Sequence, residues 1–295
     1  MKKLLILSLA LSLNTMAAEQ KEDPNAVPTT GVPYNINAPA DAFGYTVSDS
    51  SGGACAEQFI DITATGASVV VGDDVSSGPI ALLSPNPFDL YGVALTSIEM
   101  ISNGFLSPDG ASGGDLSNDC PIPASPSTGA GSRIYALHDD LDLQAGIGQG
   151  FFQYFATCPR PSDQFPTANL GCHVFQWDEV EHFPGGTAAN AFDLEVILYD
   201  DSYEIVIQHD GRNTENGSGS TTGLQDSTAT IAEMYSCDTA ASIPANSAQC
   251  FVHPNPNVAA ALAPPTPVPA NNMFAMILLS LSLFAGGFLF FRKKA

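Results

Sequence analysis

The sequence predicts an all-β protein: a single β-sandwich-like ectodomain with long loops, exported and anchored by its C-terminus. From about residue 41 to 252, short apolar segments are separated by clusters of Gly, Asn, Asp and Ser. No long stretch of this region has the 3.6-residue period of a helix, which favours a sandwich or barrel. Because about 210 exported residues can bury one substantial core, we expect one domain.

The N-terminus has the layout of a secretory signal peptide over residues 1–18. Two lysines precede the apolar run Leu4–Leu13, and small residues close the segment. A charged start, an apolar centre and a small-residue exit predict export. Residues 19–40 are rich in proline and polar side chains and are expected to form an irregular lead-in.

The ectodomain, residues 41–252, is expected to contain one clear hairpin. In Phe192–Tyr199 every second residue is apolar, an acidic turn follows, and Tyr203–His209 returns as the second strand. Two long loops, Ser107–Ser132 and Gly211–Gly223, are expected to bind a partner or to be mobile. Further strands are expected at Phe59–Thr63, Ser68–Val71, Leu90–Ser102, Arg133–Leu137, Gly150–Thr157, Cys172–Trp177 and Thr228–Tyr235.

Six cysteines in an exported chain predict disulfides. They are Cys55, Cys120, Cys158, Cys172, Cys237 and Cys250. Short separations favour the pairs Cys158–Cys172 and Cys237–Cys250, which leaves Cys55–Cys120, and Cys120 would then pin the first long loop. No C-x-x-C spacing supports zinc or a redox motif.

The C-terminus predicts a membrane anchor. A Pro-rich stalk over residues 253–272 leads to Met273–Phe291, which holds no charge and at about 1.5 Å per residue reaches roughly 28 Å. The basic tail at 292–295 predicts a cytoplasmic C-terminus with the bulk of the chain outside.

The exported part is strongly acidic. The sequence has 31 acidic and nine basic residues, and five of the basic ones lie in the signal peptide and the tail. Four cations then remain, and the charge of the exported part is near −27. Such a surface repels nucleic acid and anionic headgroups and favours solubility, cations or basic partners.

Six segments between about Pro87 and Ser236 share a specific order and spacing. They are PFDLYGVALTSIEMISNGFLSP, RIYALHDDLD, GFFQYF, VFQWDEVEHF, AFDLEVILYDDSYEIVIQHDG and TATIAEM. In this order they resemble the nidogen-type extracellular domain, in the form common in bacterial surface proteins. Leu137 and His138 stand where that family often has proline, phenylalanine or tryptophan, and Ala232 replaces a common glycine. The resemblance implies an extracellular, non-catalytic domain.

The tail also resembles a bacterial sorting signal of the kind that exosortase-type transpeptidases cleave. Its parts are a short element, Val268 and Pro269, then the apolar helix, then the basic cluster of Arg292, Lys293 and Lys294. The resemblance implies a sorting transpeptidase as a partner and transfer to the cell surface. A permanent single-pass anchor is the alternative, because many anchors share this layout.

The densest group of potential ligands is His138, Asp139, Asp140 and Asp142. Alternating carboxylates at a strand end can hold Ca²⁺ through oxygen atoms, so Asp140 and Asp142 are the candidate metal ligands, with solvated acids as the alternative. A second, weaker oxygen-rich loop contains Asp109, Asp115, Asn118 and Asp119.

Catalytic motifs are weak. Gly110–Gly114 matches the nucleophile-elbow pattern around Ser112 but lies in a Pro- and Gly-rich loop, without the strand and helix that the motif needs. Gly146–Gly150 resembles a phosphate loop but is better explained as a turn into a strand. The other histidines, His173, His182, His209 and His253, are expected to be structural. Trp177 is expected in the core rather than on a sugar-stacking surface.

These features favour a non-enzymatic cell-envelope or cell-surface protein that works in adhesion, matrix formation or assembly. Its expected partners are the membrane and a surface protein or polysaccharide, with no nucleic acid and no cofactor other than the candidate calcium. A calcium-dependent or carbohydrate-binding module is the first alternative, and a hydrolase using Ser112 or His138 is the second.

Overall fold

The computed structural model describes residues 39–111, 113–143, 148–185, 190–211, 213 and 216–258. The predicted signal peptide, the membrane segment Met273–Phe291 and the sorting residues Val268, Pro269, Arg292, Lys293 and Lys294 lie outside this part of the chain. Among the described residues, none forms a helix that is long and apolar enough to cross a membrane.

The described residues form antiparallel sheets and one short 3₁₀ helix, so this part of the chain is all-β as predicted. The elements are β1 (Thr46–Asp49), η1 (Ser50–Gly52), β2 (Ala67–Val70), β3 (Gly72–Asp73), β4 (Ser76–Ala81), β5 (Phe88–Leu90), β6 (Val93–Leu95), β7 (Ser97–Ile101), β8 (Phe105–Ser107), β9 (Arg133–His138), β10 (Leu141–Leu143), β11 (Gln149–Phe155), β12 (Cys172–His182), β13 (Phe192–Tyr199), β14 (Ile205–Asp210), β15 (Thr221–Gln225), β16 (Ala232–Cys237) and β17 (Ser247–Val252).

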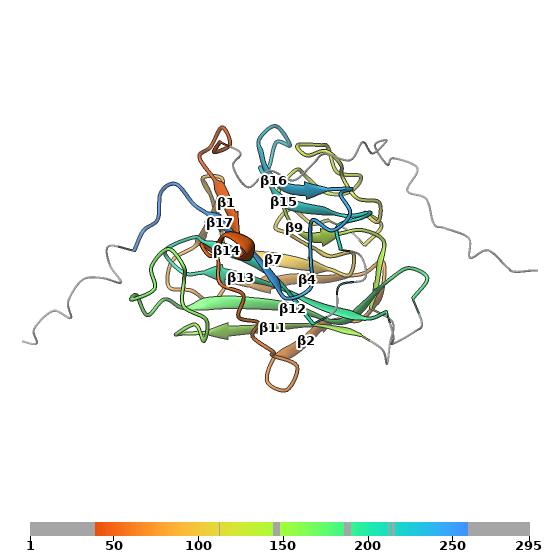
Figure 1. Cartoon of the computed structure of the whole chain (residues 1–295), viewed down its shortest axis with the longest axis horizontal. Coiled ribbons are helices and arrows are strands. Elements are labelled where there is room, and N and C mark those ends of the chain that lie inside the picture. Colours follow the sequence, from red (N-terminus) through yellow and green to blue (C-terminus); the bar gives the residue numbers. More distant parts are fainter. Residues whose placement is uncertain are drawn as a thin grey trace, which may run out of the picture. The chain divides into compact units, whose positions relative to one another are not determined.

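Two large sheets contain most of these strands (Figure 1). The nine-stranded sheet has the order β1-β17-β14-β13-β12-β10-β3, and β11 and β2 extend it from another part of β12. The six-stranded sheet has the order β16-β15-β9-β8-β7-β4, and β5 pairs with β6 in a separate hairpin. The predicted hairpin at 192–209 is confirmed, because β13 and β14 pair with Leu198 opposite Ile205.

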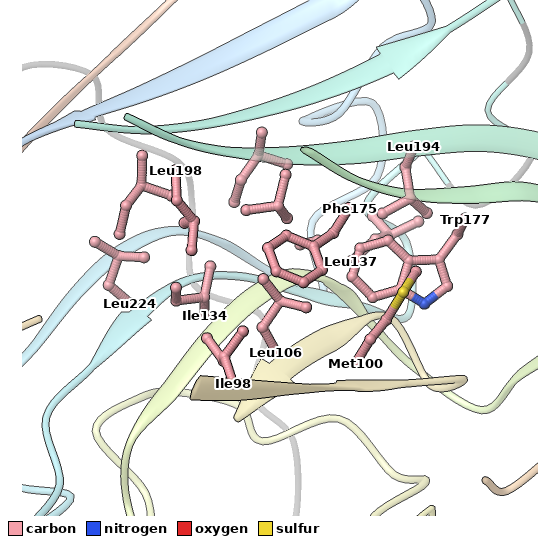
Figure 2. Close-up of a cluster of buried hydrophobic side chains, with 14 of the residues drawn as sticks. Ile98, Met100, Leu106, Ile134, Leu137, Phe175, Trp177, Leu194, Leu198 and Leu224 are labelled. Atoms are coloured by element: carbon pink, nitrogen blue, oxygen red, sulfur yellow. The ribbon is translucent and has the colours of Figure 1, made fainter. Parts of the chain in front are cut away.

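One hydrophobic core lies between the inner faces of the two sheets (Figure 2). Phe175 and Trp177 of the nine-stranded sheet meet Met100 and Leu106 of the six-stranded sheet, and all four side chains are fully buried. The indole Nε1 of Trp177 donates to the carbonyl of Ile101 at 2.8 Å, which ties the two sheets together. The predicted core position of Trp177 is confirmed.

Two strand predictions are wrong for physical reasons. Leu90–Ser102 is not one strand, because Tyr91 and Gly92 adopt φ values of 53° and 77° and reverse the chain between β5 and β6. Phe59–Thr63 has apolar alternation but belongs to no sheet ladder. Instead, its backbone is held by side chains of the nine-stranded sheet, and we call the segment Gln58–Ile62 the strap.

Three side-chain oxygens on neighbouring strands accept the backbone N–H groups of the strap. The pairs are Gln58 with Gln208 Oε1 at 2.6 Å, Ile60 with Glu195 Oε1 at 3.1 Å, and Ile62 with Gln176 Oε1 at 2.7 Å. The acceptors lie directly opposite one another across β14, β13 and β12. The strap therefore crosses the strands of the sheet, and its hydrogen bonds take the place of a ladder.

The disulfide pairing differs from the predicted one. Cys158 bonds to Cys172 as predicted, but the predicted pairs Cys237–Cys250 and Cys55–Cys120 are wrong. The structure instead joins Cys55 to Cys250 and Cys120 to Cys237. Cys237 ends β16 and Cys250 lies in β17, and these strands belong to different sheets. Cys120 does pin the first long loop, since it bonds to β16.

Candidate functional site

Carboxylates form a row across one corner of the nine-stranded sheet. Asp142 on β10 lies directly opposite Glu181 on β12 and opposite Asp73 on β3. The side chains of Asp142 and Glu181 are both 2% exposed. Like charges in directly opposite positions destabilise a sheet, so a bound cation would stabilise this row.

Asp140 lies beside the row, in the turn between β9 and β10. Its carboxylate and those of Asp73 and Asp74 each offer an oxygen, and these three oxygens lie within 4.8 Å of one another. Two oxygens that bind the same Ca²⁺ at about 2.4 Å are at most about 4.8 Å apart, so the spacing suits one shared ion. We call Asp73, Asp74, Asp140, Asp142 and Glu181 the acidic cluster.

The surroundings position the acidic cluster. The side chain of Asn103 is fully buried, donates from Nδ2 to Asp74 at 3.1 Å, and accepts the Leu141 N–H at 3.0 Å. The described residues include two arginines, Arg133 and Arg160, and no lysine. Both guanidinium groups hydrogen-bond to other residues: Arg133 to Asp115 and Arg160 to Tyr199.

The sequence prediction named Asp140 and Asp142 but missed their partners. Asp73 and Asp74 precede them by more than sixty positions in the sequence. An adjacent acid pair after the apolar run at Val69–Val71 was the only local signal of a shared site. Strand register, which brings β3 beside β10, creates the proximity.

His138 and Asp139, which neighbour Asp140 in the sequence, contact residues outside the acidic cluster. The ring of His138 is buried against Phe105 and Tyr135, with centroid distances of 4.7 and 5.3 Å. Asp139 accepts the Asp140 N–H and lies 3.5 Å from Nε2 of His182. The four residues that are adjacent or nearly adjacent in the sequence therefore contact different groups, and the side chain of His138 is fully buried.

The second oxygen-rich loop is organised by Arg133. Nη2 of Arg133 lies 3.3 Å from Oδ2 of Asp115, and both side chains are fully buried. Nη1 donates to the side chain of Ser107 and to the carbonyls of Ala130 and Ser132, each at 2.8 Å. These contacts fasten both ends of the Ser107–Ser132 loop over the outer face of the six-stranded sheet.

The other polar residues of that loop also hydrogen-bond to protein groups. Asp109 accepts the Ser132 N–H at 3.0 Å, and Asn118 donates to Asp238 at 2.6 Å. Asp119 accepts the hydroxyl of Tyr135 at 2.6 Å. Burial raises the pKa of Asp119, while nearby His138 and the Tyr135 hydrogen bond offset part of the change. These contacts give the loop a structural role.

Residues of both sequence motifs lie outside the described part of the chain. Ser112, the centre of the elbow pattern, lies outside it, as do Gly146 and Ile147 of the phosphate-loop pattern. The chain after Gly148 enters β11 rather than a helix. His173, His209 and His253 are buried: His173 accepts the Leu83 N–H at 2.7 Å, and His253 lies 3.0 Å from Asp89.

Comparison with protein families identifies the domain. A family described as NIDO related matches residues 44–262, most of the chain and nearly all of the β-structure described above. The chain belongs to the NIDO-related family. No curated protein and no solved structure matches it.

Membership in the NIDO-related family confirms the nidogen-type resemblance. It supports an extracellular, non-catalytic domain, and the three disulfides agree with an oxidising location.

Proposed function

We propose that this NIDO-related protein is a non-enzymatic component of the cell envelope or surface that works in adhesion, matrix formation or assembly. The family match across the disulfide-linked β domain carries the proposal. The charge distribution supports it. Arg133 and Arg160 have side chains at most 1% exposed, so the described exterior presents carboxylates and no Lys or Arg. Such a surface suits partners that are neutral or positively charged.

The proposed function gives each terminus a role in placing the domain at the envelope. The signal peptide exports the chain, and Met273–Phe291 holds it in the membrane either permanently or until a transpeptidase cleaves near Val268 and Pro269. The intact mass of the mature protein from inner-membrane, outer-membrane and medium fractions tests this. A mass ending near Ala295 in the inner membrane supports the permanent anchor. A mass ending near Pro269 in the outer fractions supports sorting to the surface.

A deletion strain tests the adhesive role. Loss of the gene should reduce cell attachment or retention of matrix, and the full chain supplied in trans should restore it. Attachment and matrix that are unchanged by the deletion would contradict an adhesive or matrix role.

The acidic cluster favours a second candidate function, calcium-dependent binding. Full occupancy of the cluster should stabilise the fold by mass action, by about 2.7 kcal/mol when Ca²⁺ is present at 100 times its Kd. The melting temperature of the full chain should rise with Ca²⁺ and fall back with a chelator.

Neutral variants separate a calcium site from a general charge effect. Asp140→Asn with Asp142→Asn should abolish the calcium response and leave the metal-free melting temperature equal or higher, because like-charge repulsion is relieved. The control Asp61→Asn changes an exposed acid outside the cluster and should keep the response. A calcium response that survives in the double variant would rule this site out.

A further inference from the structure

A pocket of about 160 Å³ opens beside β1 and β16, strands of the two different sheets that lie near one another in Figure 1. It is lined by Asp49, Ser50, Ser51, Tyr235, Ala241, Ser242, Pro244 and Ser247. Five of these eight residues are serine or aspartate, and Ala241, Pro244 and the ring of Tyr235 add apolar surface. The pocket therefore combines apolar surface with hydroxyl and carboxylate groups in a small volume.

The buried end of the pocket is fixed by its own hydrogen bonds. The hydroxyl of Tyr235 donates to Oδ2 of Asp49 at 2.9 Å, and Oδ1 of Asp49 accepts from the backbone and hydroxyl of Ser51 at 2.9 and 2.6 Å. Asp49 is 6% exposed and Tyr235 is 3% exposed. The carboxylate and the ring are thus held in place before a ligand arrives, which lowers the entropic cost of binding.

The pocket offers both donors and acceptors. The hydroxyl oxygen of Ser50 accepts the Ala248 N–H at 3.2 Å, so its proton is available to donate. The hydroxyl of Ser51 donates to Asp49, so its lone pairs are available to accept, and a carboxylate oxygen accepts more than one hydrogen bond. A hydroxyl group of a ligand donates and accepts at once, and this arrangement matches that requirement.

The volume limits the ligand to about one ring. A protein cavity of about 150 Å³ binds benzene, so about 160 Å³ has room for one six-membered ring. A benzene site has an apolar lining throughout, whereas this lining joins apolar surface from Ala241 and Pro244 to hydroxyl and carboxylate groups, which suits a ring that carries hydroxyls on an apolar frame. The carboxylate of Asp49 and the chain's net charge of −22 disfavour an anionic ligand.

We propose that this pocket binds one neutral pyranose ring, the terminal residue of a glycan. The inference deepens the proposed surface function by naming the ligand class of an adhesive contact, and it rests on that function for its setting. Ser50 donates to a ring hydroxyl, Ser51 and Asp49 accept from hydroxyls, and the open side of the pocket leaves space for the rest of the glycan.

Titration of the full chain with the methyl glycosides of glucose, galactose, mannose and N-acetylglucosamine tests the proposal, with saturation-transfer NMR and calorimetry as readouts. At least one glycoside should bind saturably. Ser51→Phe, at the exposed mouth of the pocket, should weaken that binding at least tenfold. Ser227→Phe replaces an exposed serine outside the pocket and should leave the affinity unchanged.

Two results would overturn the proposal: no binding by any of the four glycosides, which would leave a pocket for water alone, or equal affinity in Ser51→Phe. If Ser51→Phe lowers the melting temperature, its weaker binding could reflect damage to the fold. Asp49→Asn is then the test variant, because it keeps the side-chain shape and should weaken binding at least fivefold. Unchanged affinity in Asp49→Asn would then reject the site. Loss of attachment in the deletion strain without glycoside binding would retain the surface function and reject only the pocket.

Discussion

The backbone N–H of Ile60 donates to Oε1 of Glu195 at 3.1 Å, which joins two residues that are 135 positions apart. Glu195 is fully buried in the middle of the nine-stranded sheet and also accepts from Gln208 at 2.5 Å. The central acceptor of the strap is therefore an acid. The acceptors on either side of it are glutamines, which accept the same kind of hydrogen bond without a charge. This difference gives the fold a pH dependence that can be removed.

Glu195→Gln should stabilise the protein at neutral pH. Burial, offset in part by its hydrogen bonds and by Arg160, raises the pKa of Glu195, so the folded state binds this proton more tightly than the unfolded state does. The stabilising contribution is then complete below the unfolded pKa of about 4.3 and is lost as the pH rises. We expect a gain of about 1–3 kcal/mol at pH 8 and little at pH 4. Urea unfolding across this range measures it, and the exposed Glu179→Gln should show no such trend.

His209→Gln should make the free energy of unfolding less sensitive to acid. Burial lowers the pKa of His209 to about 3, with Gln249 offsetting part of the change. A lowered pKa means that stability is complete above the unfolded pKa of about 6.5 and is lost as the pH falls, by about 1.4 kcal/mol per pH unit. The free energy of unfolding of the variant, compared with the unsubstituted protein between pH 6.5 and 4.5, should fall less steeply. An equal slope in both would contradict a buried neutral His209.

Arg133→Met should destabilise the domain by about 3–5 kcal/mol, because it leaves the buried carboxylate of Asp115 without its cation. The Ser107–Ser132 loop should become sensitive to proteolysis before the rest of the domain unfolds. Arg133→Lys keeps the charge but loses the forked donors. The stability of this variant should therefore lie between that of the unsubstituted protein and that of Arg133→Met. Limited proteolysis with mass analysis locates the first cut, and a first cut elsewhere would argue against Arg133 as the residue that fastens the loop.

Peptide mapping of the unreduced protein should recover the pairs Cys55–Cys250, Cys120–Cys237 and Cys158–Cys172. A protease that cuts at aspartate suits this acidic chain better than one that cuts at lysine. Recovery of a peptide linked through Cys237 and Cys250 would disprove the pairing.

The loss of stability on removing a single disulfide should increase with the length of the loop that the disulfide closes. The pair Cys120–Cys237 closes a separation of 117 residues, whereas Cys158–Cys172 closes 14. The entropy of the unfolded chain predicts costs of about 4.7 and 3 kcal/mol. Paired Cys→Ser variants measured by urea unfolding test the order, and an equal or reversed order would show that native packing, not loop closure, dominates.

Local patterns in the sequence determined much of this fold. Alternation in Phe192–Tyr199 predicted a strand and its hairpin, because a side chain in a strand faces the core at every second position. The same alternation at Phe59–Thr63 indicated apolar contact but not a sheet. A strap that hydrogen-bonds to side chains has the same local pattern as a strand, so only its distant acceptors distinguish the two.

Tertiary structure decided which distant residues meet. The sequence identified all six cysteines as bonded but paired four of them wrongly, since separation along the chain does not reveal that β16 and β17 belong to different sheets. It identified Asp140 and Asp142 but not Asp73, Asp74 or Glu181, and it gave no sign of the pocket at Asp49 and Tyr235. Strand register and sheet packing create these contacts, and both depend on the free energy of the whole core rather than on any one segment.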